Sequence, residues 1–280
     1  MRGGCKRPFG WGMKAFNISP RALWRAVTIA AVGVIASTAA LAMRVSPMVL
    51  EMETRGSAAV GRLEIQNLNP GKLAFETRVT RMEFDESGNI KESPADEDFL
   101  VFPPQGVLPT NGRQVVRLQW VGPPELPASR AYYVSVNQLP VALDAAQANA
   151  NGAQVQIVYH MKALVVVAPP GASPNVEAIG ARPIQYQAPA PPGGGAAPPP
   201  GPGVEVTLKN SGRRHAMMAG MGWRLEGTDS QGKAMRIDIK PEELNRVLGT
   251  GYVPALGERS FKLPLVEPFA AKPIKVSFTK

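Results

Sequence analysis

Carboxylates that could serve as a general acid and base gather at two places in the sequence. The run Asp96–Asp98 is consecutive, so its side chains cannot all face one substrate, and it is predicted to be a solvated loop. Glu242 and Glu243 lie in the run Pro241–Leu248, and Asp238 precedes it. Proline followed by acids predicts a short helix whose N-terminus these carboxylates stabilise. Neither group has the spacing of a catalytic pair.

Nucleophilic and metal-ligating residues are scarce. The chain has one cysteine, Cys5, and two histidines, His160 and His215, and it has no HExxH, CxxC, GxGxxG, P-loop or GxSxG motif. Three methionines follow His215 closely, and packing by this adaptable side chain is favoured over a metal site: Met217, Met218 and Met221. We therefore expect no enzyme, no catalytic residue, no metal, no cofactor and no small-molecule substrate.

The positive charge of the chain is concentrated at its N-terminus. The formal net charge is +9, but residues 1–42 hold six basic residues and no acid, which leaves 25 basic against 22 acidic residues and a net charge of +3 for the remainder. The basic cluster left there is Arg213-Arg214-His215. Nucleic acid is therefore not an expected partner.

Residues 1–42 have the layout of a secretory signal peptide. A basic segment, residues 1–25, precedes an uncharged segment, residues 26–42, which ends in Ala40-Leu41-Ala42. An uncleaved membrane anchor is the alternative, but an alanine-rich segment of this length is a poor membrane span. We expect cleavage after Ala42 and a mature chain that begins at Met43 outside the cytoplasm.

From residue 43 the sequence reads as one extended run after another, separated by turns rich in Gly, Pro, Asn and Asp. This is the profile of an all-β sandwich, without room for crossover helices. The runs of the first half are residues 44–52, 61–66, 75–84, 99–102, 114–121, 132–139 and 154–168.

The longest apolar run, residues 154–168, changes character along its length. Its first half alternates, as a strand with one apolar face does. Residues 163–168 lack polar partners and are expected to lie in the core. Residues 154–162 form either an aggregation-prone edge or a docking site for another chain. The apolar face carries Val155, Ile157, Tyr159 and Met161, and the other face carries Gln156, His160 and Lys162.

The second half of the chain predicts a smaller β-domain. Residues 188–203 are almost entirely proline, glycine and alanine, a composition that cannot form a core. We favour an insertion in a loop of this domain over a linker between domains, because residues 172–187 are too few for a domain. The expected boundaries are residues 43–169 for the first domain and residues 170–280 for the second.

A set of short motifs, in this order behind a signal peptide, resembles the periplasmic chaperones of pilus and fimbria assembly, with a divergent member of the archaic type as the expectation. The resemblance implies two immunoglobulin-like β-sandwich domains in tandem, with residues 154–168 as a donor strand. It also implies that the chain stabilises incomplete pilus subunits in the periplasm, by donor-strand complementation and without ATP, and delivers them to an outer-membrane usher. The motifs are Val45-Ser46-Pro47, residues 63–67, Val101-Phe102-Pro103-Pro104, residues 108–118, Tyr133 with Leu139-Pro140, and Tyr252-Val253-Pro254.

The same resemblance implies which side chains enter the subunit. Val155, Ile157 and Tyr159 are the inserted residues, with Met161 as a fourth. Burial of a large side chain is worth about 1.5–3 kcal/mol, so three contribute about 5–9 kcal/mol before the costs of association.

The sequence departs from the family where the subunit's terminal carboxylate is usually anchored. The expected arginine and lysine positions hold Val49 and Leu164, both apolar. Lys162, one pleat away, and Arg44, on the first strand but of the opposite parity, are the possible carboxylate anchors.

Two further positions differ from the resemblance. Ser129 and Ala168 stand where the family carries a charged bridge between its domains, which predicts looser coupling. Arg117, lying between apolar residues, is expected to pair inside the sandwich.

The alternative function is a structural or adhesive surface protein whose long strand is paired internally.

Overall fold

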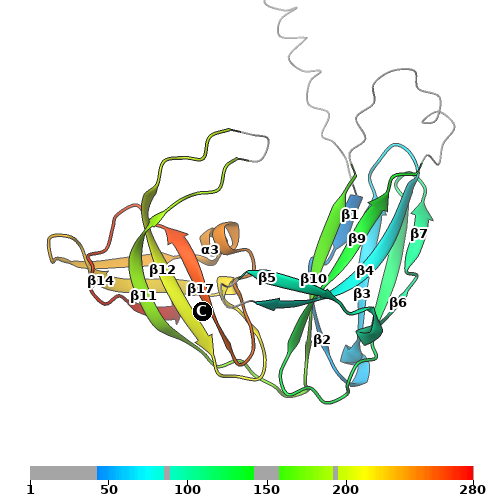
Figure 1. Ribbon diagram of the computed structural model, residues 1–280, viewed down its shortest axis with the longest axis horizontal. Helices are drawn as coiled ribbons and strands as arrows, with labels where there is room; N and C mark the ends of the chain where they lie inside the picture. The colour runs from blue at the N-terminus through cyan, green and yellow to red at the C-terminus, as the bar shows by residue number, and fades with distance from the viewer. Residues whose placement is uncertain (1–42, 85–88, 142–157, 192–194, 280) are drawn as a thin grey trace, which may run out of the picture. The chain divides into compact units, whose positions relative to one another are not determined.

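The computed structural model describes residues 43–84, 89–141, 158–191 and 195–279 (Figure 1). The predicted signal peptide, the turn at residues 85–88 and most of the loop before the long strand lie outside these ranges. The described chain is dominated by strands, so the all-β prediction is confirmed. None of the helices in the described ranges is long and apolar enough to cross a membrane.

The N-terminal sandwich, residues 43–168, consists of two sheets. One has the strand order β1-β3-β8-β6 and the other β2-β10-β9-β4-β5, with β7 also paired to β4. The first sheet contains β1 (Met43–Ser46), β3 (Val60–Asn67), β8 (Arg113–Trp120) and β6 (Phe99–Phe102). The second contains β2 (Val49–Glu53), β10 (His160–Ala168), β9 (Arg130–Leu139), β4 (Leu73–Phe84), β5 (Ile90–Pro94) and β7 (Gln105–Leu108). Two short 3-10 helices, η1 (Gly56–Ala59) and η2 (Asp96–Asp98), connect strands.

The first extended run, predicted as one strand, forms two. β1 pairs with β3 in one sheet and β2 pairs with β10 in the other. The chain changes sheets at Pro47, which has no N–H to donate to a ladder. This crossing places β2 beside the long strand.

The core of the N-terminal sandwich lies between the inward faces of its two sheets. Phe99, Trp120 and Tyr132 pack edge to face there, with ring centroids 5.0–5.8 Å apart. The Tyr132 hydroxyl donates to Oδ2 of Asp98 over 2.7 Å. The prediction of a solvated acidic loop therefore holds for Asp96, which is exposed, but is wrong for half-buried Asp98.

Arg117 lies on the outer face of β8. Val116 and Leu118 are fully buried, whereas Arg117 is exposed. The prediction that it pairs inside the sandwich was wrong, because apolar neighbours on both sides of a strand residue point inward and turn that residue outward.

The C-terminal sandwich, residues 176–279, contains three sheets, with the orders β11-β12-β17, β13-β16 and β15-β14-β18. The helix α3 (Pro241–Leu248) has the bounds predicted from the sequence. Its strands are β11 (Val176–Tyr186), β12 (Gly201–Asn210), β13 (Ala216–Met217), β14 (Gly222–Thr228), β15 (Ala234–Ile239), β16 (Tyr252–Val253), β17 (Gly257–Pro264) and β18 (Lys275–Thr279), with the 3-10 helix η3 (Met218–Gly220).

The proline- and glycine-rich segment joins two paired strands. β11 and β12 are antiparallel neighbours from Val176↔Asn210 to Tyr186↔Gly201, and the segment connects their ends. β17 pairs with β12 only as far as Gly203, so the hairpin extends beyond that strand (Figure 1). The second core does not include this segment.

Candidate functional site

The long strand β10 is paired differently along its two halves. All but its last residue face β9 in antiparallel register, from His160↔Asn137 to Val167↔Arg130. On the other side, β2 pairs in parallel with Leu164–Ala168 only. Within the described residues, the segment His160–Ala163 therefore has a neighbouring strand on one side alone. This segment, which we call the open edge, can accept backbone hydrogen bonds from an added strand.

The apolar face of β10 is continuous with the first core. Ala163, Val165 and Val167 are fully buried in that core. Tyr159 and Met161 have the same parity and pack against it, half-buried. The other two predicted insertion residues, Val155 and Ile157, lie outside the described residues.

On the opposite face, Lys162 is held in an ion pair. Its Nζ lies 2.6 Å from Oε1 of Glu92 on β5 and 5.5 Å from the centre of the Tyr133 ring. Thr80 donates to the other oxygen of Glu92 over 2.8 Å. The hydrogen bond from Lys162 is the main reason that the pKa of Glu92 lies below its usual value. The lysine is thus positioned, but already paired.

Arg44 is not brought together with Lys162. It is exposed on β1, whose neighbours Met43 and Val45 point into the core. β1 belongs to the other sheet of the sandwich, so Arg44 and Lys162 point away from the core on opposite sides.

The sequence analysis missed one basic residue that acts on Tyr133 together with Lys162, namely Arg259 on β17. The guanidinium carbon of Arg259 lies 4.8 Å from the ring centre of Phe84 and 4.9 Å from that of Phe261. Its Nη1 donates to the carbonyl of Tyr252 over 2.6 Å. In the part of the chain that is described, no salt bridge is formed by Arg259.

Tyr133 links this arginine electrostatically to Lys162. Burial raises the pKa of the Tyr133 phenol, as does Glu92, whereas the charges of Lys162 and Arg259 oppose the rise. Burial lowers the pKa of Arg259 itself. Arg259 shares its strand face with buried Phe261 and Leu263, and this parity was the one signal in the sequence that could have marked it.

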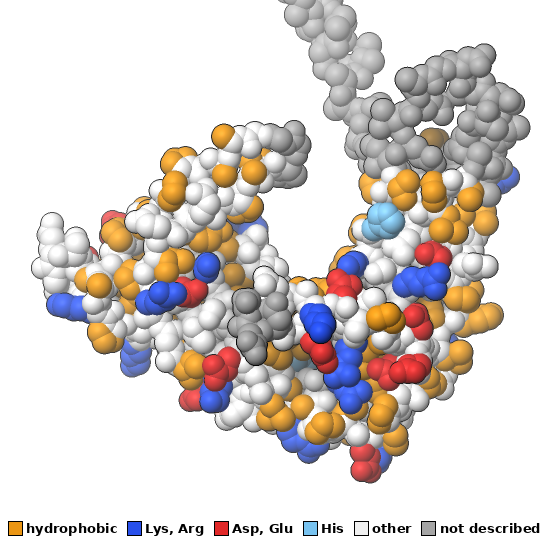
Figure 2. Space-filling view, in the orientation of Figure 1, with side chains coloured by type: hydrophobic (Ala, Val, Ile, Leu, Met, Phe, Trp, Pro, Cys, Tyr) orange, Lys and Arg blue, Asp and Glu red, His pale blue; other side chains and the backbone are white. Residues whose placement is uncertain are grey.

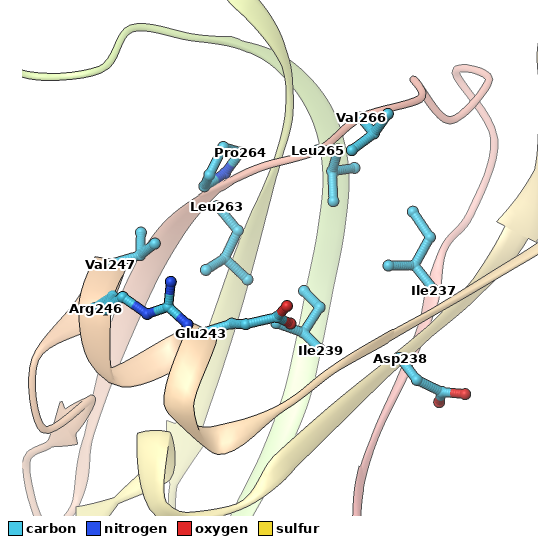
Figure 3. A pocket seen from close by; sticks show the side chains of 10 residues that line it. All are labelled: Ile237, Asp238, Ile239, Glu243, Arg246, Val247, Leu263, Pro264, Leu265 and Val266. Atoms are coloured by element: carbon cyan, nitrogen blue, oxygen red, sulfur yellow. The ribbon is translucent and has the colours of Figure 1, made fainter.

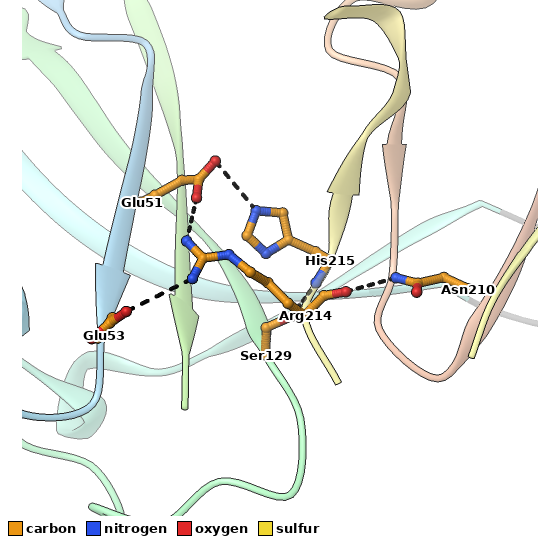
Figure 4. Close-up of polar contacts among 6 residues, drawn as sticks. All are labelled: Glu51, Glu53, Ser129, Asn210, Arg214 and His215. Atoms are coloured by element: carbon orange, nitrogen blue, oxygen red, sulfur yellow. Dashed lines mark hydrogen bonds and ion pairs between the residues drawn. The ribbon is translucent and has the colours of Figure 1, made fainter. Parts of the chain in front are cut away.

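Charged contacts connect the two sandwiches at a different place from the one expected (Figure 4). Arg214 pairs through Nη2 with Oε2 of Glu51, and its Nη1 lies 3.8 Å from Oε1 of Glu53. The backbone N–H of His215 donates to Oγ of Ser129 over 2.8 Å. A charged bridge is thus present, supplied by Glu51 and Arg214 rather than by the positions of Ser129 and Ala168. Looser coupling of the domains stays a prediction.

The Glu51 carboxylate responds to these contacts. Burial raises its pKa, but the hydrogen bond from Arg214 and the charges of His215 and Arg214 outweigh burial, so the pKa lies below its usual value. The contact is therefore made by an ionised glutamate at neutral pH.

The C-terminal sandwich has an open cavity of about 530 Å³ beside α3 (Figure 3). Its lining is largely apolar, and its carboxylates are engaged elsewhere. Glu243 accepts from the N–H of Lys240 at the start of α3 over 3.2 Å, and Asp238 accepts from Arg224 over 2.6 Å. This cavity has no converging acid and base.

The described residues also contain no group of three or more His, Cys, Asp or Glu side chains placed to hold a metal ion. On the face shown in Figure 2, basic and acidic side chains are interspersed rather than gathered into a basic surface. The features of the site that remain are thus the open edge, its apolar face and the bases beside it.

Residues 44–173 match a family model described as pili and flagellar-assembly chaperone, PapD N-terminal domain. The matched range begins in β1 and ends just after β10, so it contains the open edge. No curated protein sequence matches the chain.

Several solved structures are similar in overall fold. The E. coli chaperone DraB is 14% identical, with a TM-score of 0.47, over 86% of this chain and 96% of its own. The class 5 fimbriae chaperone CfaA is 9% identical, with a TM-score of 0.48, over 85% and 99%. A CsuC–CsuE chaperone–tip subunit complex from Acinetobacter baumannii is 12% identical, with a TM-score of 0.44, over 78% and 89%. At these values the likeness assigns no partner to this chain.

Proposed function

Since residues 44–173 form an N-terminal domain of the pili and flagellar-assembly chaperone family, we propose that the protein is a periplasmic chaperone that binds incomplete pilus subunits by donor-strand complementation. Residues 1–42 export it and are removed after Ala42. An outer-membrane usher receives the loaded subunit. Residues 43–169 and 170–280 are its two domains.

The observation that carries this proposal is the open edge of β10. A strand added along His160–Ala163 gains backbone hydrogen bonds from residues that have a described strand on one side only. Backbone bonds of this kind give affinity, and alternate side chains that fill a groove give specificity. An internally paired strand, as in a structural or adhesive protein, would need a second neighbour along the same residues.

The side chains that enter the subunit are those of the apolar face. Tyr159 and Met161 continue the inward face of β10 and are only half-buried, so they have apolar surface left to cover. Val155 and Ile157 have the same parity further along the chain. Together these four residues supply the apolar stripe that an incomplete sandwich lacks.

The carboxylate anchor is Lys162, with Arg259 as the second base in place of Arg44. Both cations act on the Tyr133 phenol, whereas Arg44 faces away on the other sheet. When the subunit binds, its terminal carboxylate displaces the Glu92 carboxylate from Nζ of Lys162. The exchange replaces one charge-assisted hydrogen bond with an equivalent one. It therefore fixes where the end of the subunit chain lies and adds little to the affinity.

Co-expression with a pilus subunit encoded beside this gene tests the proposal. The wild type should give a soluble 1:1 complex, and Ile157→Asp should abolish it, because a charge cannot enter the subunit core. Gln156→Asp, with the opposite parity, is the matched control and should leave the complex intact. A subunit that is equally soluble and stable with Ile157→Asp would contradict donor-strand complementation.

A further inference from the structure

His215 is a buried histidine with one unused ring nitrogen. The residue is 3% exposed and stacks on Tyr252 at 5.7 Å between ring centroids. Burial lowers the pKa of its imidazole. Nε2 lies 3.7 Å from Oε1 of Glu51, which is beyond hydrogen-bond distance. Among the described residues Nδ1 has no hydrogen-bond partner. In the tautomer with the proton on Nε2, it offers a lone pair.

The same imidazole lines a cavity of about 410 Å³ together with three thioethers. The chain gathers them within a short stretch, because β13 ends at Met217 and η3 begins at Met218. The Trp223 indole N–H donates to the carbonyl of Met218 over 2.9 Å and fixes this turn. Met221 follows the turn directly, and all three methionines line this cavity.

We propose that His215 Nδ1 and the thioethers of Met217, Met218 and Met221 form a binding site for a soft monovalent cation, Cu(I) or its analogue Ag(I). Thioether and neutral imidazole are ligands that soft cations prefer. A buried lone pair without a donor is satisfied by such an ion without any accompanying water. Methionine has three rotatable bonds, so the sulfurs can close on the ion without movement of the backbone.

Glu51 acts on this site through the histidine. A carboxylate that faces the second ring nitrogen fixes the tautomer and orients the ring of a metal-bound histidine. The carboxylate also faces Arg214, so its charge is already compensated and it is not free to bind a hard dication such as Zn²⁺. The predicted selectivity is therefore for the soft ion. Glu51 lies opposite Val166 of β10, outside the open edge, and the proposed ion site does not depend on the proposed chaperone function.

Anaerobic titration of the purified protein with Cu(I), supplied as its bicinchoninate complex, tests the site. The wild type should withdraw one equivalent of Cu(I) from the chelator. Met221→Leu and Met217→Leu, which nearly conserve volume, should each weaken binding about tenfold or more, and Glu51→Gln about tenfold. Met235→Leu is the matched control, because Met235 packs against the same core but does not line the cavity.

The proposal is overturned if Cu(I) stays with the chelator, or if Met235→Leu weakens binding as much as Met221→Leu. It is also overturned if Zn²⁺ binds with the same affinity and is unaffected by the leucine variants. X-ray absorption of the Cu(I) protein should show sulfur and nitrogen neighbours, and His215→Gln should remove the nitrogen signal. Thermal unfolding of each variant separates loss of the site from loss of the fold.

Discussion

Leu164 of β10 lies directly opposite Val49 of β2 in the parallel ladder that joins these strands. These are the two positions at which the resemblance places a lysine and an arginine. Both are apolar here, and they contribute to a cluster with Val166, Met82 and Tyr252. The place of a paired charge is taken by hydrophobic contact between the strand and the C-terminal sandwich.

The Leu164 side chain is therefore expected to stabilise the folded protein. Leu164 is 8% exposed, and Leu164→Ala should lower the free energy of unfolding by about 2–4 kcal/mol because it leaves a cavity in this cluster. Leu100→Ala, at a residue that is 59% exposed, should change it by less than about 0.5 kcal/mol. Chemical denaturation measures both, and equal effects would contradict this role.

Release of Lys162 from Glu92 should strengthen subunit binding. Glu92→Gln removes the carboxylate that occupies Nζ at 2.6 Å, so a subunit carboxylate no longer competes with it. Lys162→Gln should shorten the lifetime of the chaperone–subunit complex, and Arg44→Gln should leave it unchanged. Glu83→Gln, which frees Arg81 elsewhere on β4, controls for the change of charge. Surface plasmon resonance measures the dissociation rate of each complex. A longer lifetime of the complex with Lys162→Gln would contradict the role of Lys162 as the carboxylate anchor.

The Tyr132 hydroxyl should make stability fall at alkaline pH. Burial, and then the Asp98 carboxylate, raise the pKa of Tyr132. Because the folded-state pKa is raised, the unfolded state ionises first and stability is lost as pH rises above about 10. Tyr132→Phe should lower the free energy of unfolding by about 1.5–3 kcal/mol at pH 7, and this difference from the wild type should become smaller above pH 10. Urea unfolding at several pH values tests this, and a constant gap would refute it.

The Glu51–Arg214 contact should make stability fall in acid. The folded-state pKa of Glu51 is lowered, so its contribution is present above the unfolded value and is lost as pH falls through the folded one. Side chains at this contact are 24–45% exposed, so a double-mutant cycle of Glu51→Gln and Arg214→Gln should give a coupling of only about 0.5–1 kcal/mol. The coupling should weaken as pH falls below the ordinary range of a glutamate and vanish once Glu51 is protonated in the folded state. A coupling that does not depend on pH would show that the contact is not an ion pair.

Local pattern was enough to predict most of the longer elements, although not β5, and it did not predict their partners. The helix Pro241–Leu248 follows from a first-turn proline and acids, and the strands β3, β4, β8 and β9 follow from alternation. The division of residues 44–52 between two sheets needs knowledge of which strand lies alongside. Alternation in one run carries no such information.

The candidate site was predicted in part for the same reason. The division of the long strand at about residue 163 was visible, because polar residues disappear from its outer face there. Arg259 and the Glu51–Arg214 bridge were not visible, since the residues that meet in these contacts are far apart in the sequence. Whether Val155 and Ile157 enter a subunit stays a prediction.

The start of β2 sets a limit on any strand that joins the chain. The carbonyl of Met48 accepts from the N–H of Leu164 over 2.9 Å, so the ladder beyond this point is already filled. A strand that arrives along residues 160–163 must stop before Met48. The start of β2 after Pro47 therefore limits how far an added strand can extend along β10. A subunit strand that is one residue too long would have to shift its register by one residue, and this shift would turn its side chains to the wrong face.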